Sequence, residues 1–169
     1  VYNSAGELIG QKYQTGSSTV TINTRSATGC TIYAVANTGK ADLFKGYTMH
    51  KESYLKSMVY SLTNWDDLNK GTNLPMTGSM KSVNIKTGTQ TLSAKLVLTR
   101  MVAKVVLNIK VQESSGITIT NYSVKNIPAR SYYVARVSED AVQAATAAHW
   151  KESGVITTSG ATSVSKTFY

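Results

Sequence analysis

The stretch at residues 95–111 reads KLVLTRMVAKVVLNIKV and carries the longest regular alternation of apolar and polar residues in the chain. Its odd positions form a nearly apolar series: Val97, Thr99, Met101, Ala103, Val105, Leu107, Ile109 and Val111. The even positions include polar residues that can face water: Arg100, Lys104, Asn108 and Lys110. Alternation with a period of two is typical of a half-buried β-strand. At about 3.4 Å per residue the stretch is too long for one flat strand of a small domain. We therefore expect a bend or bulge near residues 99–102.

Other segments with strand character lie on both sides of this stretch. We expect strands at residues 17–24, 30–36, 80–86, 117–128 and 131–138. The segment 30–36 is apolar on both faces, which predicts a central strand that ends at the turn Asn37-Thr38-Gly39. In residues 1–13 we expect two extended pieces around Ser4-Ala5-Gly6, because this tripeptide favours a hairpin or bend.

Residues 48–63 change to a helical period. Their apolar residues fall on one stripe of a helix: Tyr54, Leu55, Met58, Val59 and Leu62. A turn-rich connection follows and ends at residues 74–78, LPMTG. Pro75 biases Leu74 towards extended geometry, and Gly78 permits a turn. We interpret LPMTG as a structural loop that returns the chain to the sheet, with Leu74 and Met76 filling the core between helix and strand.

The pattern LPxTG is also a cell-wall sorting signal, which works when an apolar membrane-spanning run follows it. The residues after Gly78 have strand character instead, and this argues against a sorting role. Residues 139–150 form either a second short helix or an Ala-rich loop. The count and period of the segments predict an all-β fold, an antiparallel β-sandwich of about seven strands with one short helical insertion.

The composition is that of an exported β-protein. Charged residues make up 16 % of the 169 residues, well below the typical quarter, while Thr, Ser, Gly, Asn and Tyr are abundant. The single cysteine, Cys30, excludes an intramolecular disulfide and a multi-cysteine metal site. Because Cys30 lies in an apolar strand segment, we expect a buried, inert thiol.

The formal net charge is +9, which raises the question of an anionic partner. The lysines are scattered along the chain, with no basic run and no aromatic ladder: Lys12, Lys81, Lys86, Lys95, Lys104, Lys110 and Lys125. This spread indicates solvated strand faces and guarded sheet edges rather than a nucleic-acid surface. An acidic surface partner stays open as an alternative.

No constellation of residues predicts an enzyme. His50 and His149 are far apart, and the acidic pairs Asp66-Asp67 and Glu139-Asp140 are adjacent residues, which point to opposite faces on a strand. The sequence lacks GxSxG, Walker and GxGxxG motifs. We therefore predict a non-enzymatic protein without cofactor or metal. Trp65 and Trp150 could form a sugar-stacking platform, or they could anchor the core and loops.

Four ordered stretches resemble the fimbrillin families of the Bacteroidales, which comprise type V pilus subunits with their anchors and tip proteins. They are YAVANTG at 33–39, LPMTG at 74–78 after the helix, LTRMVAKVVLNI at 98–109 and VKNIPARSYY at 124–133. The residues that carry the resemblance are Asn37, Gly39, Leu74, Pro75, Met76, Gly78, Arg100, Ala103, Lys104 and Pro128. Each stretch is weak alone, and their order and spacing make the match.

The resemblance implies a transthyretin-like sandwich at residues 1–160, the N-terminal domain of a two-domain protein. Residues 161–169 would then be a linker or the start of the second domain. It also implies a lipid-anchored protein of the outer membrane or fimbrium, whose partners are other pilin-type subunits bound by strand addition. The role implied is structural, with a contribution to adhesion.

The chain departs from the family pattern in three ways: it shows no lipobox cysteine, no second domain and no identifiable donor strand. Whether it is a shaft, anchor or tip subunit stays open. The resemblance gives no reason to expect nucleic acid as a partner. It implies contact with a membrane only through a lipid anchor that is not visible in this chain. The alternative function is a sandwich that binds carbohydrate or a host ligand, for which Trp65 and Trp150 are the candidate residues.

Overall fold

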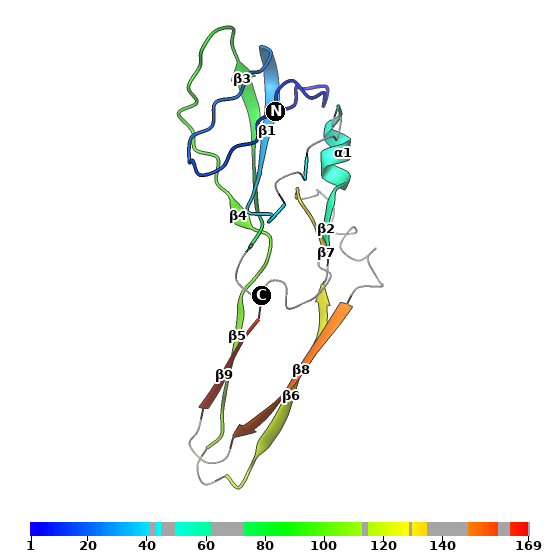
Figure 1. The fold of residues 1–169 in the computed structure, drawn as a ribbon, viewed down its shortest axis with the longest axis vertical. Coiled ribbons are helices and arrows are strands. Elements are labelled where there is room, and N and C mark those ends of the chain that lie inside the picture. Colours follow the sequence, from blue (N-terminus) through cyan, green and yellow to red (C-terminus); the bar gives the residue numbers. More distant parts are fainter. Residues whose placement is uncertain are drawn as a thin grey trace. The chain divides into compact units, whose positions relative to one another are not determined.

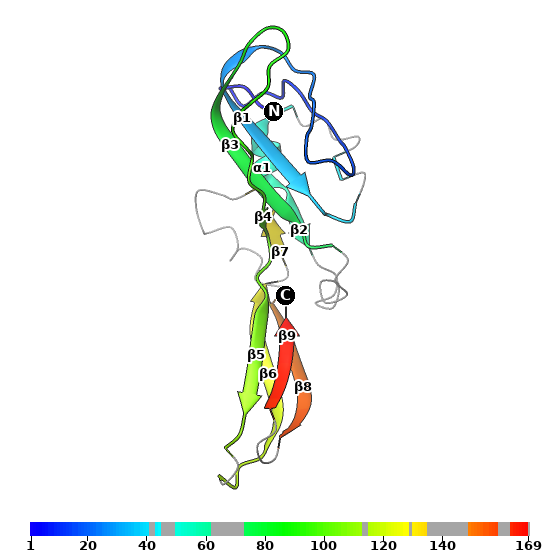
Figure 2. The ribbon, with the colours of Figure 1, turned by 90° about the vertical axis from the view of Figure 1, so that its left-hand side faces the viewer.

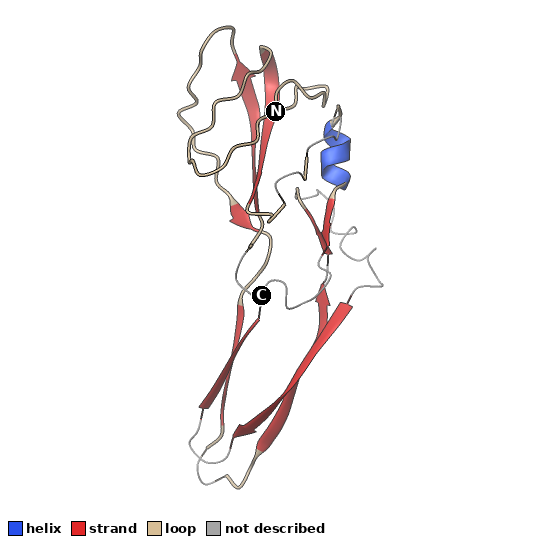
Figure 3. Cartoon of the chain, in the orientation of Figure 1, coloured by secondary structure: helices blue, strands red, loops and turns tan. Residues whose placement is uncertain are grey.

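The computed structural model describes residues 1–40, 43–44, 50–61, 73–112, 115–128, 130–134, 149–158 and 163–168. These residues are mainly β, with one short helix, as the sequence predicts (Figures 1 and 3). The chain divides into two compact units. Unit 1 comprises Val1–Val59, Asn73–Met101 and Tyr132–Val137, and unit 2 comprises Tyr60–Thr72, Val102–Ser131 and Ser138–Tyr169.

Unit 1 is built on an antiparallel sheet with the strand order β1-β3-β4. Strand β1 (Ala27–Ala36) pairs with β3 (Met76–Ile85), and β3 pairs with the short strand β4 (Thr99–Arg100). Within the described residues β3 therefore has the central place in this sheet, and the strand at 30–36, predicted to be central, lies at its side. On its other side, the described part of β1 has only an isolated bridge, between Thr31 and Tyr2.

A bulge in β1 shapes the core of unit 1. The register between β1 and β3 shifts on both sides of Cys30, and Gly29 has a φ of 64°, a conformation that glycine adopts without strain. The Gly29 amide donates a hydrogen bond to Asn84 Oδ1. Cys30 is fully buried and packs in one core cluster with Val1 and Val83. This confirms the prediction that the Cys30 thiol is buried.

The N-terminal residues form the expected bend. Tyr2 pairs with Leu8, and between them Asn3 Oδ1 accepts hydrogen bonds from the amides of Ala5 and Glu7. Such a side-chain bond mimics a backbone turn. The same segment reaches the start of the helix, because the Leu8 amide donates to His50 and the Glu52 amide donates to Gly6.

The strand expected at residues 17–24 is absent from the structure. Its backbone is held by local side chains instead of a ladder: Thr19 O accepts from Gln14 Nε2 and Ser17 Oγ. Such local bonds compete with strand pairing. Val20 is 49 % exposed, whereas Ile22 packs against the Val1–Cys30–Val83 core.

The helix is much shorter than the periodicity predicts. Helix α1 spans only Glu52–Ser57, and Met58 already has an extended backbone that leads into β2 (Val59–Ser61). Of the predicted stripe, Leu55 is buried, while Tyr54 is 61 % exposed. The Met58 carbonyl accepts a hydrogen bond from the Tyr133 amide, so tertiary pairing of an extended chain replaces further helical turns.

The long alternating stretch at 95–111 breaks where the sequence predicts. It forms β4, bends at residues 101–102 and continues as β5 (Val105–Lys110). At this bend, between Met101 and Val102, the chain passes from unit 1 to unit 2. Along the odd positions, Val97 and Val105 are 74 % and 56 % exposed. Met101, Leu107 and Ile109 are half-buried, and Val111 is buried.

Unit 2 contains two antiparallel pairs, β5–β9 and β6–β8 (Figure 2). Strand β6 spans Ile119–Pro128, β8 His149–Thr158 and β9 Ser163–Phe168. A register shift after Ile119 lets both Ile119 and Tyr122 be half-buried despite their odd and even positions. Ile117 lies outside β6 and is 61 % exposed, contrary to our expectation.

The C-terminal part of the chain differs most from the sequence prediction. We predicted no strand for 149–158 or 163–168, yet these residues are β8 and β9. The strand expected at 131–138 is β7 (Arg130–Tyr132), which pairs with β2, and 135–138 lie outside the described residues. The two alternatives for 139–150 are also outside them, apart from the start of β8. The domain limit at residue 160 stays a prediction.

Gly78→Ala tests the close approach of the chain beside β3. A Cβ at Gly78 would lie 2.1 Å from the Val97 carbonyl oxygen, so the backbone must move. We expect the free energy of unfolding to fall by about 1–3 kcal/mol, measured by urea denaturation with circular dichroism. Ser79→Ala, at the next and exposed position, is the control and should change stability little. An unchanged Gly78→Ala protein would contradict this packing.

Candidate functional site

The family-motif residues of unit 1 meet where β1 ends and β3 begins. Asn37 has a φ of 55°, a left-handed conformation that asparagine tolerates better than most residues. Its Nδ2 donates a hydrogen bond of 3.0 Å to the Leu74 carbonyl. Directly beside this bond, Ala36 pairs with Met76. The turn after β1 is thereby fastened to the segment that starts β3.

Gly39 and Pro75 complete this junction. Gly39 has a φ of 69°, and a Cβ there would lie 2.6 Å from Asn73 Nδ2. Pro75 is fully buried, and its carbonyl accepts a hydrogen bond of 2.8 Å from the Met101 amide. Met76 in turn pairs with Arg100. The junction therefore joins three sequence stretches, at 36–39, 73–78 and 99–101.

The interpretation of LPMTG as a loop needs correction. Only Leu74 and Pro75 precede the strand, because β3 begins at Met76 and includes Gly78. The fully buried residue is Pro75, whereas Leu74 and Met76 are half-buried. A proline at this position costs no ladder bond because it stands just before the strand.

The remaining predicted residues are not part of the junction. Ala103 and Lys104 are exposed residues of unit 2, just before β5, and Pro128 ends β6 opposite His149. Trp65 lies outside the described residues, and Trp150 pairs with Ile127 in the β6–β8 ladder. The sugar-stacking platform of Trp65 and Trp150 therefore stays a prediction.

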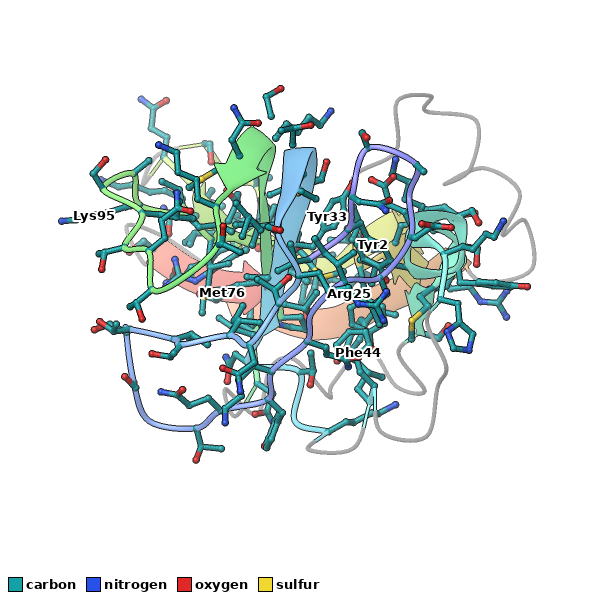
Figure 4. The ribbon with its side chains drawn as sticks, turned by 90° about the horizontal axis from the view of Figure 1, so that it is seen from above. Tyr2, Arg25, Tyr33, Phe44, Met76 and Lys95 are labelled. Atoms are coloured by element: carbon teal, nitrogen blue, oxygen red, sulfur yellow. The ribbon has the colours of Figure 1, made fainter. Side chains whose placement is uncertain are left out.

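A polar cluster that the sequence analysis missed fastens helix α1 to β1. The Tyr33 hydroxyl donates a hydrogen bond to Glu52, and Lys56 Nζ lies 3.0 Å from the same carboxylate. The rings of Tyr2 and Tyr33 meet edge to face at 6.0 Å (Figure 4). Tyr2 is buried, so its ring fills the space between the N-terminal bend and the sheet.

The cluster shifts the titration of its members. Burial, the hydrogen bond to Glu52 and the charge of Glu52 raise the pKa of Tyr33. For Glu52, burial raises the pKa, but hydrogen bonds from Tyr33 and Lys56 and the charges of Lys56 and Lys81 outweigh it and leave the pKa lowered. Both shifts favour a neutral tyrosine that donates to an ionised carboxylate.

The described residues hold no set of three or more His, Cys, Asp or Glu side chains that could bind a metal ion. Asp66-Asp67 and Glu139-Asp140 lie outside them. No helix in the described part of the chain is long and apolar enough to cross a membrane.

Strand β5 of unit 2 exposes apolar side chains. Val105 and Val106 of β5 are 56 % and 46 % exposed, although they point to opposite faces of the strand. Within the described residues, β5 pairs along one edge only, with β9. In the part of the chain that the structure describes, no strand pairs with its other edge, and an unpaired edge can accept a further strand.

Comparison with known proteins identifies the family. The family model described as fimbrillin-A associated anchor proteins Mfa1 and Mfa2 matches residues 1–164. The chain belongs to this family. The resemblance to fimbrillin proteins is thereby confirmed, and the protein takes part in fimbria assembly at the cell surface. The members are structural fimbrial proteins, in keeping with a chain that is not an enzyme. No curated protein and no solved structure gives a significant match.

Substitution of Asn37 tests the junction after β1. Asn37→Ala loses the bond to Leu74 and strains the positive φ, so we expect a loss of about 1–3 kcal/mol in the free energy of unfolding. Asn37→Gly removes the bond but relieves the strain, and it should lose about half as much. The exposed Asn23→Ala is the control. Equal stability of the Ala and Gly variants would show that the backbone strain is unimportant.

Tyr33→Phe tests the bond to Glu52 through its pH dependence. The pKa of Glu52 is lowered from an ordinary value of 4.5, so the bond stabilises the folded state above this pH and is lost as the pH falls through the lowered pKa. At pH 7 we expect Tyr33→Phe to cost about 1–2 kcal/mol of unfolding free energy.

The difference between the wild type and Tyr33→Phe should shrink in acid, where Glu52 is protonated. Tyr54→Phe, on the exposed side of the same helix, should match the wild type at every pH. Denaturant titrations between pH 7 and pH 3 check both expectations. A pH-independent difference between Tyr33→Phe and the wild type would contradict a bond to an ionised carboxylate.

Proposed function

We propose that this chain is a structural, non-enzymatic fimbrial subunit that is built into the fimbria by donor-strand exchange at the free edge of β5. In this reaction a strand from a neighbouring subunit adds to an exposed sheet edge. Backbone hydrogen bonds supply affinity, and alternate side chains supply specificity. The observation that carries the proposal is the edge of β5, which no described strand covers.

The side chains of β5 suit this role. Leu107 and Ile109 are half-buried on one face, and Val111 just beyond the strand is buried. A donor strand beside β5 would extend that apolar face by one strand. At the start of β5, Val105 and Val106 are exposed. Burying them under a donor strand would favour binding by roughly 25 cal/mol of free energy for each Å² of apolar surface removed from water.

The proposed partner and the proposed anchoring follow from the family. The family is named for association with fimbrillin-A, so the partner proposed for β5 is a fimbrillin-A subunit. In this proposal residues 1–160 form one transthyretin-like β-sandwich, the N-terminal domain of a longer, lipid-anchored protein. Adhesion follows from the display of the assembled fimbria.

Hydrogen exchange of the full-length protein with purified fimbrillin-A tests the assembly step. We expect the amides of residues 105–110 to exchange more slowly in the complex, because a donor strand pairs with their free edge. The ladder between β1 and β3 is already paired and serves as the internal control. The complex should also persist in SDS until it is heated.

A stable complex in which the amides of residues 105–110 exchange as fast as in the free protein would contradict the proposal. Protection confined to unit 1 would place the contact elsewhere. A protein that forms no SDS-resistant complex after any protease trimming of either partner would likewise argue against strand exchange.

A further inference from the structure

The β5–β9 pair has an outer face whose members are all exposed. The register pairs Val106 with Thr167, Asn108 with Ser165 and Lys110 with Ser163, and residues directly opposite each other share one face. The outer face comprises Val106, Asn108, Lys110, Ser163, Ser165 and Thr167, all exposed. The opposite face holds the half-buried Leu107, Ile109, Val164 and Lys166, with the exposed Val105 at its end. The strand pair thus has a distinct solvent side.

The charge of the outer face is of one sign. Lys110 lies within it, and the exposed Lys104 stands two residues before Val106, the spacing at which side chains return to the same face. Residues 99–112 and 163–168 contain no Asp or Glu. Neither lysine has an ion pair with any residue that the structure describes. Among the residues that the structure describes, no carboxylate therefore compensates the two positive charges that flank the exposed Val106 and Asn108.

The charge of the chain indicates which strand can add there. The sequence holds 18 Lys and Arg against 9 Asp and Glu, so a second copy of this chain is a poor partner on electrostatic grounds. Like charges opposite each other on neighbouring strands are destabilising, whereas opposite charges contribute roughly 0.2–1 kcal/mol per pair. The free edge thus favours an acidic strand over a neutral or basic one.

We infer that the edge of β5 selects a donor strand of the fimbrillin-A subunit that carries carboxylates opposite Lys104 and Lys110 and apolar residues opposite Val105, Leu107 and Ile109. This inference rests on the proposed strand exchange and adds the chemistry of the partner. Lys104 and Lys110 are six residues apart in the sequence, which corresponds to about 20 Å along a strand. The selected strand alternates, with acidic residues at the two ends of its outer face.

Peptide binding to the full-length protein tests the selection. The probe peptide alternates Ile with Thr, and it carries Glu at both ends of the part that faces residues 104–110. A matched peptide carries Gln at these ends, and a third carries Lys. Because the pattern is the same in both chain directions, parallel and antiparallel addition are tested together. Fluorescence anisotropy of labelled peptides gives the dissociation constants.

We expect the Glu peptide to bind about tenfold more tightly than the Gln peptide at low salt, and the preference to shrink in high salt. The double variant Lys104→Glu/Lys110→Glu should lose this preference and bind the Lys peptide instead. Lys12→Glu/Lys86→Glu, at exposed positions of unit 1, changes the net charge equally. This control should keep the wild-type order of affinities.

The outcomes separate the inference from the proposed function. Equal binding of all three peptides, with slower exchange of residues 105–110, would overturn the charge selection and leave strand addition intact. Failure of every peptide and of fimbrillin-A itself to protect residues 105–110 would overturn both. An equal loss of the preference in both double variants would assign it to net charge and overturn the role of Lys104 and Lys110.

Discussion

The antiparallel ladder between β1 and β3 is the interaction on which unit 1 depends. It runs from the pair Ala36–Met76 to the pair Ala27–Ile85. One end of the ladder brings Cys30 and Val83 into the same core cluster. The other end brings Asn37 against Leu74 and sets Met76 beside Arg100. The core and the motif junction are therefore two ends of one register, and a slip by one residue would turn every side chain to the wrong face.

The sequence predicted those parts of the fold whose alternation is strong. β1, β3, β5 and the bend between β4 and β5 were expected, because each has apolar residues at alternate positions or a length that one strand cannot span. β8 and β9 were missed because they are rich in Ser, Thr and Lys and follow a stretch of uncertain period. In β9, Val164 and Phe168 lie on one face, and the intervening residue of that face is Lys166. Because Lys166 interrupts the apolar alternation, the period of two was a weak signal for this strand.

The residues of the candidate site were likewise predicted only in part. Asn37, Pro75, Gly78 and Arg100 were predicted as structural motif residues, and the structure brings them together through β1, β3 and β4. The bond between Tyr33 and Glu52 could not be predicted. It joins a strand to a helix that the periodicity makes far too long, and only the true start of that helix sets Glu52 beside the sheet. The apolar periodicity of a segment does not indicate which side chain of another element lies beside it, so it could not predict this contact.

The shortness of β4 has a mechanical consequence. The chain enters β5 from β4 through only a few residues, and β4 is held to β3 by just Thr99 and Arg100, next to the bond from Met101 to Pro75. Releasing β4 from β3 would therefore break far fewer backbone bonds than opening the ladder between β1 and β3, which closes the core around Cys30.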